Sequence, residues 1–231
     1  MKRFYDTVAI EERDDGWQVT LDGRGIKTVK TAPQILPTRA LAQELAKEWE
    51  AQGEELDPTL FPMRDMADYA LDIVASSQSK IAEDLTGFGD TDTLLYRADP
   101  DEPLYIQQIE VWEPIVTAFE EREGIAFTRI SGIIHKPQSG NSLAHLRKLL
   151  EAQKPFALAG IEAMTNLAAS LITALTAAQN HREALELWRA ASLEEEWQAE
   201  QWGRDAEADE RRAKREQDFL TAHLFVQASK N

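Results

Sequence analysis

The stretch VAIEERDDGWQVTLDGRGIKT, from Val8 to Thr28, decides how the chain begins to fold. Apolar and polar side chains alternate along it, which is typical of strands with one buried face. Asp15-Gly16 and Asp22-Gly23 separate three such runs, and glycine readily adopts the positive φ that tight hairpins require. The stretch therefore predicts a small antiparallel sheet, in which Leu21 to Gly25 is a hairpin turn and not a phosphate-binding loop.

Helical spacing of apolar residues dominates the rest of the chain. Thr38 is expected to cap a helix over residues 39–52, and Ser76–Ser79 is the expected linker. Further helices are predicted around Met66–Val74 and over residues 104–122, 142–153, 156–178, 181–201 and 205–227, with a short strand or extended segment over Ile125–His135. The predicted fold class is α+β: a β-rich N-terminal domain with helices over residues 1–78, then a mainly α-helical domain over residues 79–231.

Charge and composition limit the classes of partner. The chain has 25 basic and 41 acidic residues, and its formal net charge of -16 repels nucleic acid and anionic membrane surfaces. Without cysteine, it has no disulfide, thiolate metal site or thiol nucleophile. Polar residues interrupt the most apolar stretch, 156–178, which favours a buried helix over a membrane span. Because the first residues resemble neither a signal peptide nor a presequence, a soluble, cytoplasmic protein is expected.

The sequence carries few of the patterns that catalysis requires. It has no G-x-S-x-G elbow and no glycine-rich phosphate loop, and no two of its four histidines have the i, i+4 spacing of a helical zinc site. Asp90 and Asp92 lack the closing glutamate of a calcium loop, so one of them is expected to cap a helix. No catalytic residue, cofactor or metal is predicted. A carboxylate-based or metal-dependent hydrolase that uses Glu195, Asp205 or Glu207 stays open as an alternative.

The segment from Trp188 to Glu207 is the candidate for function. As one continuous helix it would align Trp188, Glu195 and Trp202 along one stripe, together with Ala191 and Gln198. A carboxylate among apolar rings costs free energy unless a cation accompanies it, so Glu195 would select a positively charged partner. Two alternatives remove this role: an internal ion pair between Glu195 and an arginine, or a helix break nearby.

The residues after Gly203 predict a helix that is largely solvated. Glu207 and Arg211, like Glu210 and Lys214, have the i, i+4 spacing of helical ion pairs. Acidic neighbours balance the basic residues, so nucleic-acid binding is not expected there. The end of the helix is expected to dock on the core through Phe219, Leu220, Leu224 and Phe225.

Motifs spread over most of the chain point to a known family. They are Lys2-Arg3-Phe4-Tyr5, Leu21-Asp22-Gly23-Arg24, Glu48-Trp49, Asp92-Thr93-Leu94-Leu95-Tyr96-Arg97, Trp112-Glu113-Pro114, Gly132-Ile133, Leu193-Glu194-Glu195-Glu196-Trp197-Gln198 and Trp202-Gly203-Arg204-Asp205-Ala206-Glu207-Ala208. With these motifs, in this order, the sequence resembles the assembly chaperones of the ATP synthase catalytic head that bind the free alpha subunit. The resemblance implies a strand-rich N-terminal domain, a helical domain, and neither catalysis nor a cofactor.

The resemblance also implies a partner and a set of residues that bind it. An acidic residue of the family's Leu-Asp-Glu-x-Trp/Tyr-Gln segment is important for function and corresponds here to Glu195, while Glu194 replaces the family's aspartate and Arg204 replaces a later acid. The predicted partner-binding residues are Glu195, Glu194, Gln198, Trp202, Asp205 and Glu207. The implied partner is the ATP synthase alpha subunit, held until the beta subunit replaces it.

Other implications concern the state of the protein in the cell. A monomer without membrane insertion is expected, and the net charge of -16 argues against nucleic-acid binding. The expected location is the bacterial cytoplasm, with eukaryotic relatives in the mitochondrial matrix. A general interaction module for some other protein is an alternative that the sequence does not separate from this hypothesis.

Overall fold

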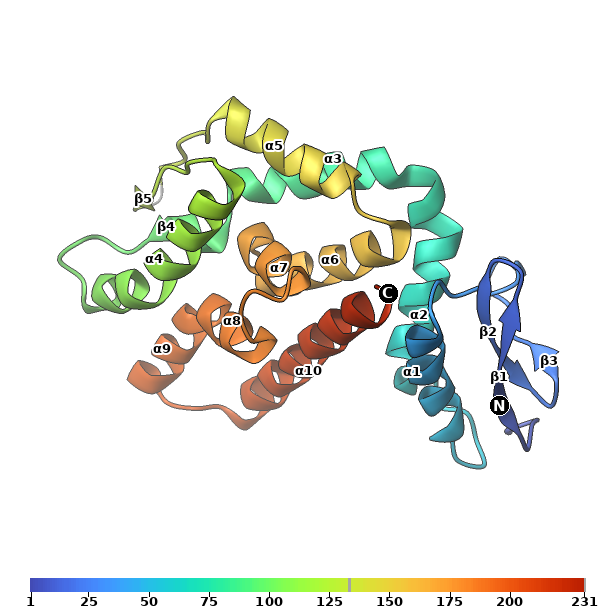
Figure 1. Ribbon diagram of the computed structural model, residues 1–231. Coiled ribbons are helices and arrows are strands. Elements are labelled where there is room, and N and C mark those ends of the chain that lie inside the picture. The colour runs from blue at the N-terminus through green and yellow to red at the C-terminus, as the bar shows by residue number, and fades with distance from the viewer. Residues whose placement is uncertain (133, 231) are drawn as a thin grey trace. The chain divides into compact units, whose positions relative to one another are not determined.

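The computed structural model describes residues 1–132 and 134–230 (Figure 1). The chain divides into two compact units. The first contains Met1–Gln78, Lys154–Gly160 and the described residues from Leu224 onward, and the second contains the remaining described residues from Ser79 to Gln153 and from Ile161 to His223. Small sheets and many helices confirm the predicted α+β class.

The first unit begins with the predicted antiparallel sheet. Strands β1 (Val8–Arg13), β2 (Gly16–Leu21) and β3 (Arg24–Gly25) lie in the order β1-β2-β3. Asp22 and Gly23 both have positive φ, as the hairpin turn requires. The third strand is shorter than the alternation predicts. Lys27 forms only an isolated bridge with Pro33, because the chain turns back after Thr28.

Helices cover this sheet within the first unit. Helix α1 (Arg39–Glu50) begins at its predicted cap, where the Leu41 amide donates to the Thr38 hydroxyl over 3.0 Å. The turn η1 (Pro58–Leu60) leads into α2 (Pro62–Tyr69), and the π-helical segment η2 (Ala70–Val74) continues it. The buried face of α1 includes Leu41, Leu45 and Trp49, and it packs against β1 and β2.

The segment predicted as a linker, Ser76–Ser79, is helical, although the two units divide within it, between Gln78 and Ser79. These residues belong to helix α3 (Ala75–Asp90), in which Ser77 alone has non-helical angles, with φ -127° and ψ 17°. The Ser76 hydroxyl donates to the Ile73 carbonyl over 3.1 Å, a local bond that a helix accommodates. The division at residue 78 thus falls inside a helix, and separate domains over 1–78 and 79–231 stay a prediction.

The elements after α3 are short strands, turns and helices. They are η3 (Thr93–Leu95), β4 (Tyr96–Arg97), α4 (Pro103–Glu123), β5 (Ile130–Ser131), α5 (Gly140–Glu151), α6 (Pro155–Ala168), α7 (Leu171–Ala178), α8 (Ala184–Ala191), α9 (Leu193–Trp202) and α10 (Ala206–Ala228). The extended segment predicted over 125–135 contains β5, which pairs with β4 in parallel. Ile133, which belongs to that prediction and to one motif, lies outside the described residues. No helix among the described residues has the length and apolarity that a bilayer crossing requires.

Two helices predicted as continuous are each broken. The segment 156–178 divides into α6 and α7, because Ala169 has a φ of +48° and Ser170 caps α7 by accepting from the Thr173 amide. The segment 181–201 divides into α8 and α9 at Ser192. Serine competes with helical bonds through its own side chain and is common at such boundaries.

Asp92 accepts hydrogen bonds at the starts of both η3 and α7, which confirms the prediction that Asp90 or Asp92 is a helix cap. It accepts from the Leu94 amide over 3.1 Å at the start of η3, and from the Ile172 amide over 2.9 Å at the start of α7. Burial raises the pKa of Asp92 to about 6, although these hydrogen bonds oppose the shift.

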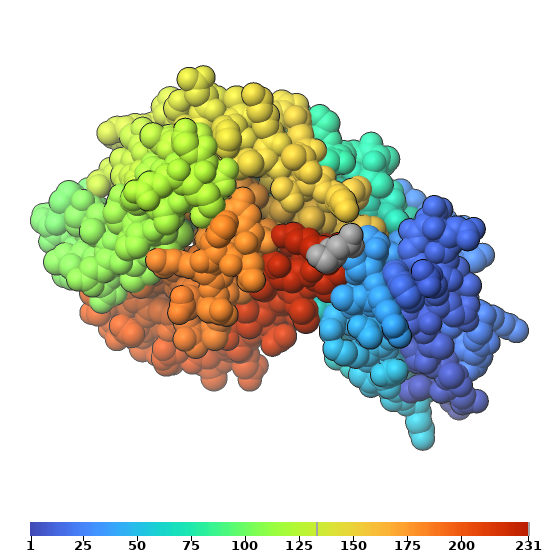
Figure 2. Space-filling view, in the orientation of Figure 1, coloured from blue at the N-terminus to red at the C-terminus, as the bar shows by residue number. Residues whose placement is uncertain are grey.

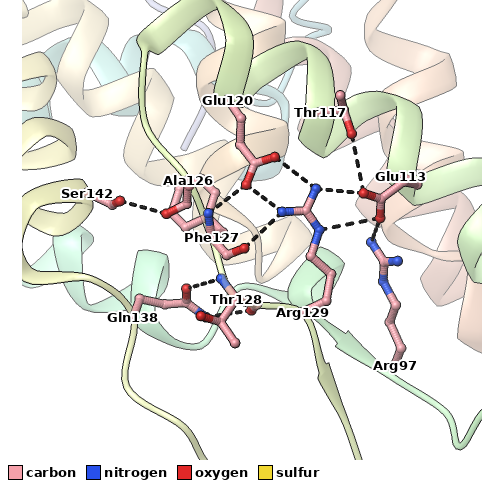
Figure 3. A network of polar contacts seen from close by, with 10 residues as sticks. All are labelled: Arg97, Glu113, Thr117, Glu120, Ala126, Phe127, Thr128, Arg129, Gln138 and Ser142. Carbon is pink, nitrogen blue, oxygen red and sulfur yellow. Dashed lines mark hydrogen bonds and ion pairs between the residues drawn. The ribbon is translucent and has the colours of Figure 1, made fainter.

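A second polar network holds β4, β5 and α4 together (Figure 3). Arg129 donates to Glu113 over 2.7 Å and to Glu120, while the buried Arg97 lies 2.6 Å from the other Glu113 oxygen. Burial alone would raise the pKa of Glu113, but hydrogen bonds from Arg129 and Arg97 hold it below its usual value. Glu120 also accepts from the Phe127 amide, which fixes the chain leading to β5.

Candidate protein-binding site

A hollow of about 430 Å³ lies between α9 and α10. Its lining residues are Glu195, Gln198, Ala199, Trp202, Gly203, Asp205, Ala208, Arg211, Arg212 and Arg215. Four of the six predicted binding residues therefore meet here: Glu195, Gln198, Trp202 and Asp205. Figure 2 shows the surfaces of α9 and α10, in orange and red, side by side on this face.

The turn between the two helices shapes the hollow. Helix α9 ends at Trp202, and Gly203 follows with a φ of +96° that favours glycine. Asp205 then starts α10, since its carboxylate accepts from the Ala208 amide over 2.9 Å. Asp205 thus has a capping role as well as a place in the lining.

Glu195 forms an internal ion pair. Arg215 donates to its two carboxylate oxygens over 2.7 and 3.1 Å, and also to the Leu167 carbonyl over 2.9 Å. The Arg215 guanidinium lies 5.4 Å from the centre of the Trp188 ring. The alternative of an internal pair with an arginine is therefore the one that the structure contains.

The single tryptophan stripe is wrong, because Ser192 separates α8 from α9. Trp188 is only 3% exposed and packs against Phe219, with 5.4 Å between the ring centres. Trp202, in contrast, is 80% exposed. Trp188 is accordingly a core residue, whereas Trp202 leaves most of its indole ring in solvent.

Glu194 and Glu207 lie outside the lining of the hollow. Glu194 accepts from the Gln108 side chain over 2.7 Å, and its burial raises its pKa. Glu207 is exposed and pairs with Arg211 at the predicted i, i+4 spacing. The two adjacent glutamates of α9 thus face different surroundings: Glu194 lies against α4, and Glu195 faces α10.

The predicted binding residues include no arginine, although arginines form a large part of the site. Arg211, Arg212 and Arg215 line the hollow. Arg212 pairs with Asp209 and Glu196, and Arg204 pairs with the same two carboxylates. The i, i+4 spacing of Arg211 and Arg215 was the available signal, but balanced charges made that face resemble an ordinary solvated one.

The chemistry of the hollow fits recognition of a protein surface. Among its lining residues, three guanidinium groups accompany two carboxylates and one exposed indole. Within residues 1–132 and 134–230, no group of three or more histidine, aspartate and glutamate side chains is placed to hold a metal ion. Tryptophan and arginine are enriched at protein interfaces relative to the rest of the surface.

Similarity to known proteins defines the class. Residues 2–120 match the family model described as ATP12 chaperone protein, so the chain belongs to the ATP12 chaperone family. Atp12 from Paracoccus denitrificans is 33% identical, with a TM-score of 0.94 over 99% of this chain and 98% of that one. An aspartate-to-lysine mutant of the same Atp12p has 33% identity and a TM-score of 0.93, with the same coverage. The Atu1473 protein of Agrobacterium tumefaciens is 35% identical, with a TM-score of 0.94 over 99% of this chain and 86% of that one.

Proposed function

We propose that this protein is an assembly chaperone of ATP synthase, which binds the unassembled alpha subunit and prevents its aggregation until the beta subunit takes over. Membership of the ATP12 family and 33% identity to Paracoccus denitrificans Atp12 over almost the whole chain support this role. The observation that carries it is the hollow between α9 and α10, where an exposed tryptophan lies beside accessible ion pairs.

Trp202 supplies the apolar part of the contact. Its indole is large and already exposed, so burying it against a partner removes apolar area from water without first unfolding anything. The function would then be to cover an apolar surface of the free alpha subunit that is otherwise prone to aggregate.

Glu195 and Arg215 supply the polar part. Their side chains are 43% and 40% exposed, so the pair gains little from its own attraction and exchanges partners at low cost. A client cation can bind Glu195 while a client carboxylate binds Arg215. Charge pairs of this kind set orientation and specificity more than affinity.

Release requires neither a nucleotide nor a cofactor. A chaperone shifts the equilibrium toward the unassembled alpha subunit only through its differential affinity for that form. The beta subunit covers the same client surface in the assembled enzyme and therefore competes. We place this cycle in the bacterial cytoplasm, with the chaperone as a monomer that performs no catalysis.

Co-purification tests the proposal. The alpha subunit is expressed without beta, together with the native chain, Glu195→Lys or the control Glu200→Lys, which reverses an exposed charge on the same helix. We expect soluble alpha subunit with the native chain and the control, and at least about tenfold less with Glu195→Lys. Equal solubility of the alpha subunit without the chaperone refutes the function. Equal capture by Glu195→Lys removes Glu195 from the binding site.

A further inference from the structure

A separate groove lies within the first unit, away from α9 and α10 in sequence. It has a volume of about 580 Å³ and is bordered by the start of the chain, β3 and its following segment, α1 and α2. Three of the motifs that carry the family resemblance contribute to it, through Phe4, Tyr5, Arg24 and Trp49 among others. The hollow between α9 and α10 uses none of these residues.

The groove has an exposed apolar wall. Phe4 is 62% exposed and Val29 is 83% exposed, while Ile26 and Trp49 form a buried base. The aromatic rings form a row from the rim to the base. The ring centres of Phe4 and Tyr5 lie 5.4 Å apart in an edge-on arrangement, and those of Tyr5 and Trp49 lie 5.6 Å apart. This packing holds Phe4 in place at the rim, where it leaves apolar surface in water.

The available charge in the groove is positive, although the chain as a whole carries -16. The exposed side chains of Arg24 and Lys27 have no hydrogen-bond or ion-pair partner within the described part of the chain. The two acids of the lining are already engaged: Asp22 accepts from the Thr7 amide over 2.8 Å, and the buried Asp68 accepts from Gln34 over 2.6 Å. Burial also raises the pKa of Asp68.

The groove continues along α2, which sets the size of its occupant. A neighbouring hollow of about 480 Å³ shares Val29, Arg64 and Asp68 with it and adds the exposed Ile73. It also adds Lys30 and two acids that are already engaged, since Asp65 pairs with Arg64 over 2.6 Å and Asp72 accepts from the Thr28 hydroxyl over 2.8 Å. Together the two hollows offer room for several side chains in a row. An extended peptide segment fits this shape, and an acidic residue in that segment complements Arg24 and Lys27.

We propose that this groove is a second client-binding surface, which takes an extended segment in which a bulky apolar residue lies next to an acidic one. The inference rests on the proposed function, because the segment belongs to the client that the chaperone holds. Two surfaces on one chain that bind one client raise the overall affinity beyond that of either surface alone.

The client test compares three full-length proteins in the capture of the free alpha subunit. They are the native chain, the double variant Arg24→Glu with Lys27→Glu, and a control, Lys148→Glu with Lys154→Glu, which makes the same charge change at exposed positions outside the groove. We expect the groove variant to lose at least about tenfold in capture and the control to stay within about twofold. Capture by the native chain with no loss in the groove variant overturns the groove and leaves the proposed function standing.

A peptide test works even if the alpha subunit is not the client. Fluorescent Ser-Gly-Asp-Leu-Phe-Asp-Gly-Ser and its counterpart with both aspartates replaced by lysine are titrated with the full-length chain, and anisotropy is measured. We expect the acidic peptide to bind at least about tenfold more tightly, and the double charge reversal to abolish this preference. No binding, or no preference between the peptides, overturns the proposal. If the charge-reversed variant does not fold, the test is repeated with two other variants. One is the double variant Arg24→Gln with Lys27→Gln, and the other is Val29→Asp.

Discussion

The guanidinium of Arg215 donates to the carboxylate of Glu195 over 2.7 Å, and the same group lies 5.4 Å from the ring centre of Trp188. One arginine thus connects α10 to the buried face of α8 and to the exposed face of α9. The carboxylate of Glu195 is satisfied inside the free protein. A client cation must therefore compete with Arg215 for it.

A double-mutant cycle measures how strongly Glu195 and Arg215 interact in the free protein, which is the interaction that a client cation must replace. We expect Glu195→Gln and Arg215→Gln to show a coupling of no more than about 1 kcal/mol, because both side chains are about two-fifths exposed. Arg215→Gln alone costs more than Glu195→Gln, since it also loses the bond to the Leu167 carbonyl and the contact with Trp188. Urea unfolding provides the free energies. A coupling of several kcal/mol would show that the pair is a structural element and not an exchangeable one.

Trp188 and Trp202 are expected to separate folding from binding. Trp188→Ala removes a buried ring that packs on Phe219 and should lower the free energy of unfolding by about 3–5 kcal/mol. Trp202→Ala should change it by less than about 0.5 kcal/mol, because its ring is exposed, yet reduce capture of the alpha subunit about tenfold or more. Urea unfolding and co-purification are measured on both variants. Unchanged capture by folded Trp202→Ala contradicts the binding role.

Glu48 should make stability depend on pH. Burial raises its pKa from 4.5 to about 7, although the Met63 and Arg64 amides donate to it over 2.7 and 2.9 Å. The folded state then binds the proton more tightly than the unfolded state, so the contribution of Glu48 to stability is largest below pH 4.5 and falls as the pH rises to about 7. Above that value it is constant.

Urea unfolding at several pH values from about 4 to about 8 tests this expectation, because this range extends beyond both ends of the window from pH 4.5 to about 7. The difference in free energy of unfolding between the native chain and Glu48→Gln should fall through the window and level off above it. Glu50→Gln, at an exposed position two residues away, is the matched control and should give a flat difference. A flat difference for Glu48→Gln as well contradicts the raised pKa.

Asp92 should be a major determinant of the stability of the second unit. Asp92→Ala leaves the Leu94 and Ile172 amides without their acceptor in a buried position, and we expect a loss of about 3 kcal/mol or more. Asp92→Asn retains one acceptor oxygen and should lose less. Thermal and urea unfolding compare the two variants with Asp99→Ala, an exposed position on the loop after β4. Equal stability of Asp92→Ala and the control would contradict the structural role.

The sequence by itself determined the features that depend on neighbouring residues. Alternation from Val8 to Leu21 gave the sheet, Asp22-Gly23 gave its turn, and Thr38 gave the start of α1, because strand periodicity, positive φ and capping are all local effects. Motifs spread over most of the chain indicated the family, and the binding residues predicted around Glu195 and Trp202 supplied four of the ten residues that line the hollow.

Only the tertiary structure decided where the helices break and which charges meet. The apolar pattern of 156–178 continues through Ala169, yet the α7 start is anchored by Asp92, which is distant in sequence. Arg215 lies 20 residues after Glu195, and Arg24 reaches the same groove as Phe4 and Trp49. Hydrogen bonds and ion pairs of this kind join residues far apart in the chain, so no local propensity or periodicity encodes them, and they exist only once the surrounding core has packed.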